Sequence, residues 1–175
     1  EPCSHWGRTP PCTEQVIRSG IHEIIIGSKD INPLVNGYNE IKARGIKARI
    51  GILKEQCDKL NEYFFKWMRT KKPFVIVKAA MSLDGKIATR TGDSKYISGT
   101  EARKFVHQLR SEVDAVMVGI NTAMKDNPEL TVRLVKGRNP KKIIVDTFLQ
   151  LRENSNVVKT EPEKLIIATS KKANK

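Results

Sequence analysis

The sequence predicts an α/β protein in which parallel strands alternate with helices. Candidate strands occur at residues 22–27, 46–50 and 74–81, and the runs at 22–27 and 74–81 are rich in apolar, β-branched residues, which are typical of buried strands. Short helical stretches that end at glycines precede the first two of these candidate strands. Two successive helix and strand units of this kind favour a layered fold with a parallel sheet.

The first half of the chain predicts short elements and then one long helix. Thr13 is a candidate cap for the first helix, and Gly20 and Gly45 follow the two short helices. The predicted elements are a helix over 13–19, a strand over 22–27, a loop over 28–37, a helix over 38–44, a strand over 46–50 and a helix over 53–69. In the last helix, apolar residues recur at steps of three and four and share one face: Leu53, Cys57, Leu60, Phe64 and Trp67.

Polar residues and a proline at 70–73 interrupt this pattern and predict a domain boundary between domains at 1–70 and 73–175. The second domain begins with the apolar strand at 74–81. The elements predicted after it are a turn over 82–85, an extended piece over 86–89, a helix over 100–110, a strand over 114–118, a helical turn over 122–125 and strands over 142–146 and 164–169.

Two cysteines near the start of the chain are candidate metal ligands. Cys3 and Cys12 flank a loop that proline and glycine keep irregular, and two thiolates can bind zinc. Burial as small apolar side chains and a disulfide are the alternatives. Cys57 is the only other cysteine; it falls in the amphipathic helix and is predicted to be a core residue. A count of three is a poor basis for a disulfide framework.

The charge balance is strongly basic, with a formal net charge of +13. Nucleic-acid binding and attraction of anionic small molecules are one interpretation. A solvated lysine-rich surface is favoured, because the basic residues are scattered and aromatic residues make up only 6%. The sequence has no apolar run long enough for a membrane span, and reduced thiols without a secretion signal predict a cytoplasmic protein.

Several motifs, in order, resemble one family. In the first half these are Glu1-Pro2-Cys3, Gly-Arg-Thr-Pro-Pro-Cys at 7–12, the loop at 30–37, Gly45-Ile46 and the segment at 60–64. In the second half they are the segments 78–88, 92–98 and 126–133. Together they resemble the bifunctional deaminase/reductase of riboflavin biosynthesis, over residues 1 to about 147.

The resemblance implies a fold and two activities. The fold would be the C-terminal part of a cytidine-deaminase-like three-layer α/β sandwich, followed by the N-terminal part of a domain like dihydrofolate reductase. The deaminase would use Zn2+ to hydrolyse the amino group of a diamino-ribosylamino-pyrimidinone 5′-phosphate. The reductase would use NADPH to reduce the ribosyl group of the product to ribityl. The complete protein is expected to be a homo-oligomer.

Within the deaminase part, the resemblance implies that Cys3 and Cys12 bind the metal. The family places a third ligand and the catalytic base in a His-x-Glu motif upstream, and no His of this chain has Glu two residues later. We therefore expect a fragment that lacks both ends of the family's sequence and cannot deaminate alone. Arg8 and Asn32 fall at positions near the substrate; a surface arginine and a turn residue are the alternatives.

Within the reductase part, the resemblance implies cofactor contacts, substrate contacts and two catalytic residues, Lys78 and Asp126. The cofactor-contacting positions are Ala80, Tyr96, Thr122, Asp126 and Thr147. The substrate-contacting positions are Ser94, Arg110, Leu130 and Arg133. Arg110 and Arg133 would clamp the phosphate, although a helix-end cation and a surface arginine are the alternatives.

Lys78 closes the apolar strand predicted at 74–81, where a buried ammonium would be costly unless paired. This cost is a reason to suspect a site, and Asp126 is the expected neighbouring carboxylate. Lys78 would hold the ribose carbonyl while hydride arrives at C1′.

Two other classes of function remain open from the sequence. One is a basic, zinc-containing module that binds nucleic acid, although the resemblance favours a small-molecule substrate and no nucleic-acid partner. The other is a non-catalytic fragment that acts only within an assembly.

Overall fold

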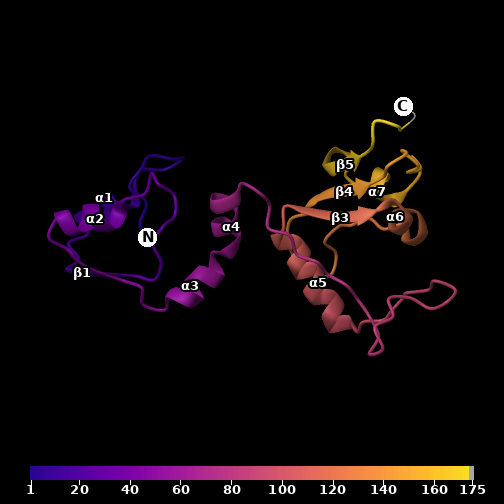
Figure 1. Cartoon of the computed structure of the whole chain (residues 1–175), viewed down its shortest axis with the longest axis horizontal. Helices are drawn as coiled ribbons and strands as arrows, with labels where there is room; N and C mark the ends of the chain where they lie inside the picture. Colours follow the sequence, from indigo (N-terminus) through magenta and orange to yellow (C-terminus); the bar gives the residue numbers. More distant parts are fainter. Residues whose placement is uncertain (174–175) are drawn as a thin grey trace. The chain divides into compact units, whose positions relative to one another are not determined.

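The structure is a computed structural model that describes residues 1–173. The chain divides into two compact units, Glu1–Lys78 and Ala79–Lys175 (Figure 1). This division falls shortly after the boundary predicted at residues 70–73. In both units, parallel strands are joined through helices, so the α/β class predicted from the sequence is confirmed.

Unit 1 contains a two-stranded parallel sheet. Glu23 pairs with Lys47 at one end of the ladder and Ile26 with Ile50 at the other. The elements of this unit are α1 (Cys12–Arg18), β1 (Glu23–Ile26), α2 (Gly37–Ala43), β2 (Lys47–Ile50), α3 (Lys54–Leu60) and α4 (Glu62–Thr70). The first four confirm the short helices and strands predicted from the sequence.

The long helix predicted over 53–69 is wrong, because Asn61 divides it into α3 and α4. The side-chain amide of Asn61 donates a hydrogen bond to the carbonyl oxygen of Cys57 at 2.7 Å, and the backbone N–H of Asn61 donates to the same oxygen at 3.2 Å at the end of α3. The break also changes which face is buried. Phe65 is buried, whereas Leu60 and Trp67 are 80% and 51% exposed. Cys57, predicted as core, is half-buried.

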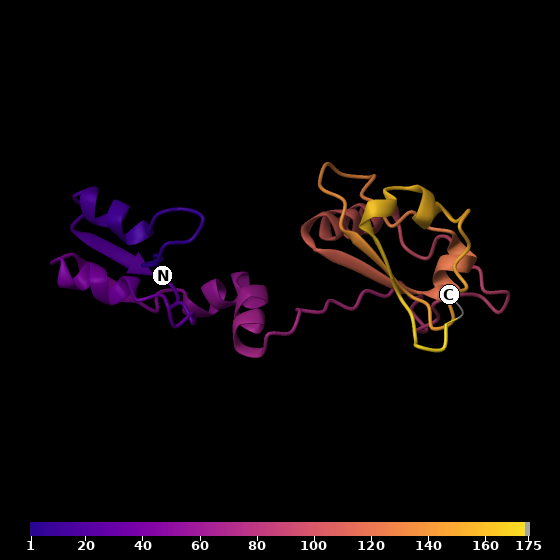
Figure 2. The same cartoon turned by 90° about the horizontal axis from the view of Figure 1, so that it is seen from above.

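The apolar segment 74–81 forms no strand, which corrects a second prediction. Figure 2 shows the part that precedes unit 2 as an irregular trace. Within residues 1–173, no backbone hydrogen bond outside the regular elements involves this segment. Val75 and Val77 are 73% and 88% exposed. An apolar run becomes a strand only where another strand pairs with it, and no strand among residues 1–173 pairs with this segment. The extended piece predicted at 86–89 likewise forms no strand.

Unit 2 is built on a parallel sheet with the strand order β3-β4-β5. Its elements are α5 (Thr100–Glu112), β3 (Ala115–Gly119), α6 (Ile120–Asp126), β4 (Lys141–Val145), α7 (Asn156–Lys159), the short 3-10 helix η1 (Pro162–Lys164) and β5 (Leu165–Ala168). The two longer helices and the three strands agree with prediction; α7 and η1 were not predicted. In Figure 1, α5 leads into β3, and α6 follows at the far end of that strand.

The core of unit 2 lies on one side of this sheet. Ala123 of α6, Ile144 of β4 and Val157 of α7 are buried together, with Leu130 from the loop after α6. Burial of these side chains fixes α6 and the loop after it against the strands. In the part of the chain that the structure describes, no helix is long and apolar enough to cross a membrane.

Candidate functional site

Three of the predicted cofactor-contacting residues lie near the carboxyl edge of the β3-β4-β5 sheet. Thr122 and Asp126 belong to α6, which begins directly after β3, and Thr147 follows β4 by two residues. Because parallel strands end at the same edge, the structure gathers these residues where open α/β sheets bind ligands. Thr122 and Thr147 are exposed, and Asp126 is half-buried.

The turn after β4 is organised by Asp146, which the sequence analysis did not single out. Asp146 is fully buried, and its Oδ2 atom accepts a hydrogen bond from the backbone N–H of Leu151 at 2.8 Å. Its Oδ1 atom has no hydrogen-bond partner among residues 1–173. The Thr147 carbonyl oxygen accepts hydrogen bonds from Ser170 N and Oγ at 3.2 and 2.9 Å. Both contacts fix the segment that carries Thr147.

Arg110 and Arg133, the two predicted phosphate ligands, are linked through Thr131. The Nη1 atom of Arg110 donates to the carbonyl oxygen of Thr131 at 2.6 Å. The Nη1 atom of Arg133 donates to the Thr131 hydroxyl at 3.0 Å and to the Glu129 carboxylate at 3.0 Å. Burial, and then the charge of Arg133, lowers the pKa of Arg110. The structure therefore brings together two cations that the sequence separates by 23 positions.

His107 completes this cluster from α5. The imidazole is buried, and its Nδ1 atom accepts a hydrogen bond from the backbone N–H of Arg133 at 3.0 Å. Burial lowers the pKa of His107, and the charges of Arg110 and Arg133 lower it further. Sequence reasoning missed this residue. Its position three residues before Arg110, on one helix face, was the signal that could have found it.

Leu130, predicted to contact substrate, lies in the core of unit 2 with 6% exposure. Its φ of +59° is in the left-handed region, which is uncommon for a non-glycine residue. The neighbouring core side chains hold it there. A substrate contact by this residue stays a prediction.

The remaining predicted residues of unit 2 lie in the loop before α5. Tyr96 is exposed, and the guanidinium carbon of Arg103 lies 4.3 Å from the centre of its ring. Ala80 and Ser94 are half-buried. A side chain at Gly92 would collide with the ammonium of Lys125, so this part of the loop lies against α6.

Lys78 is exposed, which corrects the expectation of a buried ammonium at the end of a strand. The reason is the absence of a strand pairing at 74–81, which leaves the side chain in solvent. Lys78 is the last residue of unit 1, whereas Asp126 belongs to unit 2. Their pairing, and a catalytic role for either, stay predictions.

In unit 1, Cys3 and Cys12 lie next to each other as free thiols. The backbone N–H of Cys12 donates to the Cys3 sulfur at 3.2 Å, and that of Thr13 donates to the Cys3 carbonyl oxygen at 3.2 Å. The hydrogen bonds from Cys12 lower the pKa of Cys3, while the bond to Cys3 raises the pKa of Cys12. Within residues 1–173, no group of three or more metal-ligating side chains is present, so the two thiols alone fall short of the three or four protein ligands that a zinc site needs, and metal binding by them stays a prediction.

The two residues of unit 1 that are predicted to contact substrate, Arg8 and Asn32, lie in loops. Arg8 is exposed in the loop between the cysteines. Asn32 forms a local turn, in which its side-chain oxygen accepts from the Leu34 N–H at 3.1 Å and its own N–H donates to Asp30 at 2.7 Å. This geometry is the one expected of a turn residue, which was the alternative to a substrate contact for Asn32.

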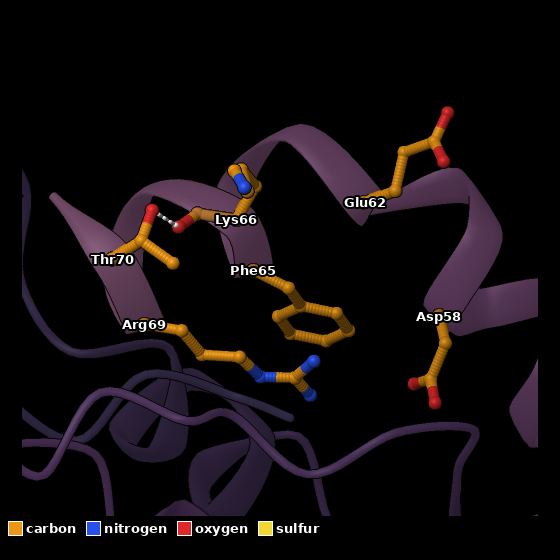
Figure 3. A pocket seen from close by; sticks show the side chains of 6 residues that line it. All are labelled: Asp58, Glu62, Phe65, Lys66, Arg69 and Thr70. Atoms are coloured by element: carbon orange, nitrogen blue, oxygen red, sulfur yellow. Dashed lines mark hydrogen bonds between the residues drawn. The ribbon is translucent and has the colours of Figure 1, made fainter. Parts of the chain in front are cut away.

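A hollow of about 360 Å³ also lies in unit 1, against α3 and α4 (Figure 3). None of the predicted site residues lines it. The lining residues are Asp58, Glu62, Phe65, Lys66, Arg69 and Thr70. Figure 3 shows the Arg69 side chain extending beneath the Phe65 ring, with the guanidinium carbon 5.6 Å from the ring centre. Two acidic and two basic side chains line this hollow, so their formal charges balance.

Unit 2 is thus an α/β domain with a parallel sheet, polar residues at the carboxyl edge and a cationic cluster beside α5. Residues 73–175 match the family described as "RibD C-terminal domain", and the chain belongs to this family. This match, together with the relatives below, confirms the resemblance drawn from the motifs.

Similar proteins come from several bacteria. The chain is 44% identical to the riboflavin biosynthesis protein RibD of Aquifex aeolicus, over all of this chain and 50% of that protein. It is 45% identical to RibD of Actinobacillus pleuropneumoniae, over 97% of this chain and 46% of that protein. The chain spans about half the length of the curated relatives it matches.

Solved structures agree. A diaminohydroxyphosphoribosylaminopyrimidine deaminase/5-amino-6-(5-phosphoribosylamino)uracil reductase from Thermotoga maritima is similar, with 43% identity and a TM-score of 0.91, over all of this chain and 50% of that chain. RibD from Acinetobacter baumannii is similar with 36% identity and a TM-score of 0.86, over 97% of this chain and 49% of that chain.

Proposed function

We propose that unit 2 is an NADPH-dependent reductase domain of riboflavin biosynthesis. Its substrate would be a ribosylamino-pyrimidine 5′-phosphate, whose ribosyl group is reduced to ribityl. The observation that carries this proposal is the Arg110 and Arg133 pair joined through Thr131, because two guanidinium groups can bind one phosphate by charge-assisted hydrogen bonds. The bifunctional name of the similar Thermotoga maritima protein supports it.

The residues at the sheet's carboxyl edge fit a nucleotide cofactor. Thr122 and Thr147 present exposed hydroxyl groups, and Asp146 fixes the turn that holds Thr147. NADPH, when bound, supplies the hydride for the reduction. The chain's own contribution at this edge is to orient the cofactor with hydroxyl groups from α6 and from the turn after β4.

Phosphate binding would depend on donors that remain free on the two guanidinium groups. Each guanidinium carries five N–H donors, and only some of them contact Thr131 and Glu129. The Glu129 carboxylate holds the Arg133 side chain in place. The pair would fix the phosphate end of the substrate and thereby position the ribosyl carbon for reduction.

Lys78 and Asp126 are proposed as the residues that handle the proton. A hydride added at C1′ would form a new C–H bond while the C1′–O bond breaks and its electron pair goes to the oxygen, and Lys78 or water would donate the proton that this oxygen then needs. The Lys78 side chain is exposed, so a bound substrate can reach it.

The experiment is a reduction assay of the complete protein with the ribosylamino-pyrimidine 5′-phosphate, followed by the loss of NADPH absorbance. Arg110→Ala and Arg133→Ala should each raise the KM for this substrate by about 10-fold or more and leave the NADPH KM unchanged. Lys136→Ala, an exposed cation near Arg133, is the matched control. No NADPH oxidation together with salt-dependent binding of generic DNA would favour the nucleic-acid-binding alternative.

The proximity of Cys3 and Cys12 supports a second proposed activity, that of a deaminase. We propose that they are two thiolate ligands of a zinc deaminase site, because the structure brings the two cysteines together. Residues 1–173 hold no complete ligand set and the sequence has no His-x-Glu motif, so we expect no ammonia release from this chain. Zinc content should fall in Cys3→Ser and Cys12→Ser and stay unchanged in Cys57→Ser. Equal zinc content in all four proteins would contradict a site at this pair.

A further inference from the structure

His107 and Arg110 hold the same short segment from one face of α5. Arg110 donates to the carbonyl oxygen of Thr131, and His107 accepts from the N–H of Arg133, at 2.6 and 3.0 Å. Between these contacts, the N–H of Val132 donates to the Asn139 side chain at 2.7 Å. The backbone of residues 131–133 is therefore held at three successive positions.

The contact from His107 fixes the backbone N–H of Arg133, the residue that carries the second guanidinium. An imidazole nitrogen that accepts an N–H bond carries no proton, so Nδ1 of His107 acts here as a pure acceptor. The bond sets the place of the Arg133 backbone, from which the side chain turns back to Glu129 and Thr131. His107 is buried, so water cannot replace this acceptor without rearrangement.

We propose that His107 is a positioning residue of the anion site: its imidazole fixes the backbone of Arg133, so that the guanidinium groups of Arg133 and Arg110 converge on one phosphate group. This inference rests on the proposed function, in which that phosphate belongs to the substrate. His107 itself makes no contact with the phosphate. It acts through Arg133, and its loss affects the affinity for a phosphorylated ligand and not the chemistry.

The test compares two substitutions that differ in one acceptor. His107→Asn keeps an acceptor near the position of Nδ1, and His107→Leu keeps most of the apolar volume without an acceptor. In the complete protein, His107→Leu should raise the KM for the phosphorylated substrate about 10-fold, whereas the KM of His107→Asn should stay within about threefold of that of the unchanged protein. The kcat and the KM for NADPH should not change in either. Gln108→Ala, exposed on the next position of α5, is the control.

A merely structural role predicts a different result. It would lower kcat and both affinities together, in step with the loss of thermal stability of each variant. Equal substrate KM values for the Leu and Asn variants would overturn the inference. If the Leu variant does not fold, His107→Gln replaces it; its acceptor lies one bond farther out and should raise the substrate KM at least about threefold, and an unchanged KM would also overturn the inference.

Failure of the inference can be distinguished from failure of the proposed function. Arg110→Ala and Arg133→Ala test the anion site itself. If neither changes the substrate KM, the proposed function is wrong at this site. If both raise the KM while His107→Leu does not, the arginine pair binds the phosphate and the positioning role of His107 is wrong. The affinity of each variant for ribose 5-phosphate, measured by direct binding, gives the same comparison of the arginine and His107 variants without turnover.

Discussion

The Nζ atom of Lys142 donates a hydrogen bond to the carbonyl oxygen of Val157 at 2.7 Å, and a second one to that of Thr160. Lys142 lies in β4 and is only 1% exposed. Burial lowers its pKa, while the nearby carboxylates of Glu161 and Glu163 act in the opposite direction. The buried ammonium thus satisfies carbonyl groups at the end of α7 and ties this helix to the sheet.

Lys142→Met should lower the free energy of unfolding by about 1–3 kcal/mol. Methionine keeps the apolar stem in the core but leaves the two carbonyl oxygens without a donor. Denaturant unfolding followed by circular dichroism measures the change. Lys141→Met, at the exposed neighbouring position, should change the stability by less than about 0.5 kcal/mol. Equal stabilities of the two variants would show that the hydrogen bonds of Lys142 do not anchor α7.

Local patterns predicted most of the helices and strands because they depend on neighbouring residues. The strand at 22–27 lies where Ile24, Ile25 and Ile26 follow one another, and the strand at 46–50 lies where apolar residues alternate with basic ones. The helix at 100–110 lies where apolar residues recur with a helical period. The errors arose where the secondary structure depends on a distant strand or on a single side-chain contact. The strand predicted at 74–81 lacks a pairing strand, and one side-chain amide, that of Asn61, ends α3 inside an amphipathic pattern.

In the candidate site, too, some residues could be singled out from the sequence and others only from contacts in the folded structure. Phosphate binding by Arg110 and Arg133 is inferred from the family resemblance and stays a prediction. His107, Thr131 and Asp146 could not be singled out, since their roles come from backbone contacts that form only when α5, the 129–133 segment and the turn after β4 meet. Spacing in the sequence does not show which N–H or carbonyl group a side chain will reach.

The stability of the protein should fall as the pH drops below about 6.5, in part because of His107. The pKa of His107 is lowered in the folded state, so the unfolded chain binds its proton first as the pH falls. The contribution of neutral His107 is complete above the unfolded pKa and is lost as the pH decreases through the folded one. His107→Asn should show a shallower slope of thermal stability against pH between about 7 and 5. Identical slopes would mean that His107 titrates alike in both states.

Substitutions at the neighbouring residues Asp146 and Thr147 should have different effects, the first on stability and the second on NADPH binding. Asp146→Ala leaves the half-buried N–H of Leu151 without this acceptor and should cost about 1–3 kcal/mol in unfolding free energy, while Asp146→Asn keeps an acceptor and should cost less. Thr147→Ala, at an exposed side chain, should leave the stability within about 0.5 kcal/mol and weaken NADPH binding. Thermal unfolding and NADPH fluorescence titration measure the two effects. An unchanged dissociation constant for NADPH in Thr147→Ala would remove this residue from the cofactor site.

Lys78→Ala should lower kcat for the reduction by about 100-fold or more if Lys78 donates the proton to the ribosyl oxygen. Because Lys78 is exposed, the substitution should leave the unfolding free energy within about 0.5 kcal/mol and the dissociation constant for NADPH unchanged. Lys78→Arg keeps the charge but holds its proton far more tightly, so it should also be slow. Lys86→Ala removes another exposed lysine of the same motif and serves as the control. A kcat for Lys78→Ala equal to that of the control would assign the proton to water, with the exposed ammonium then acting only as a surface charge.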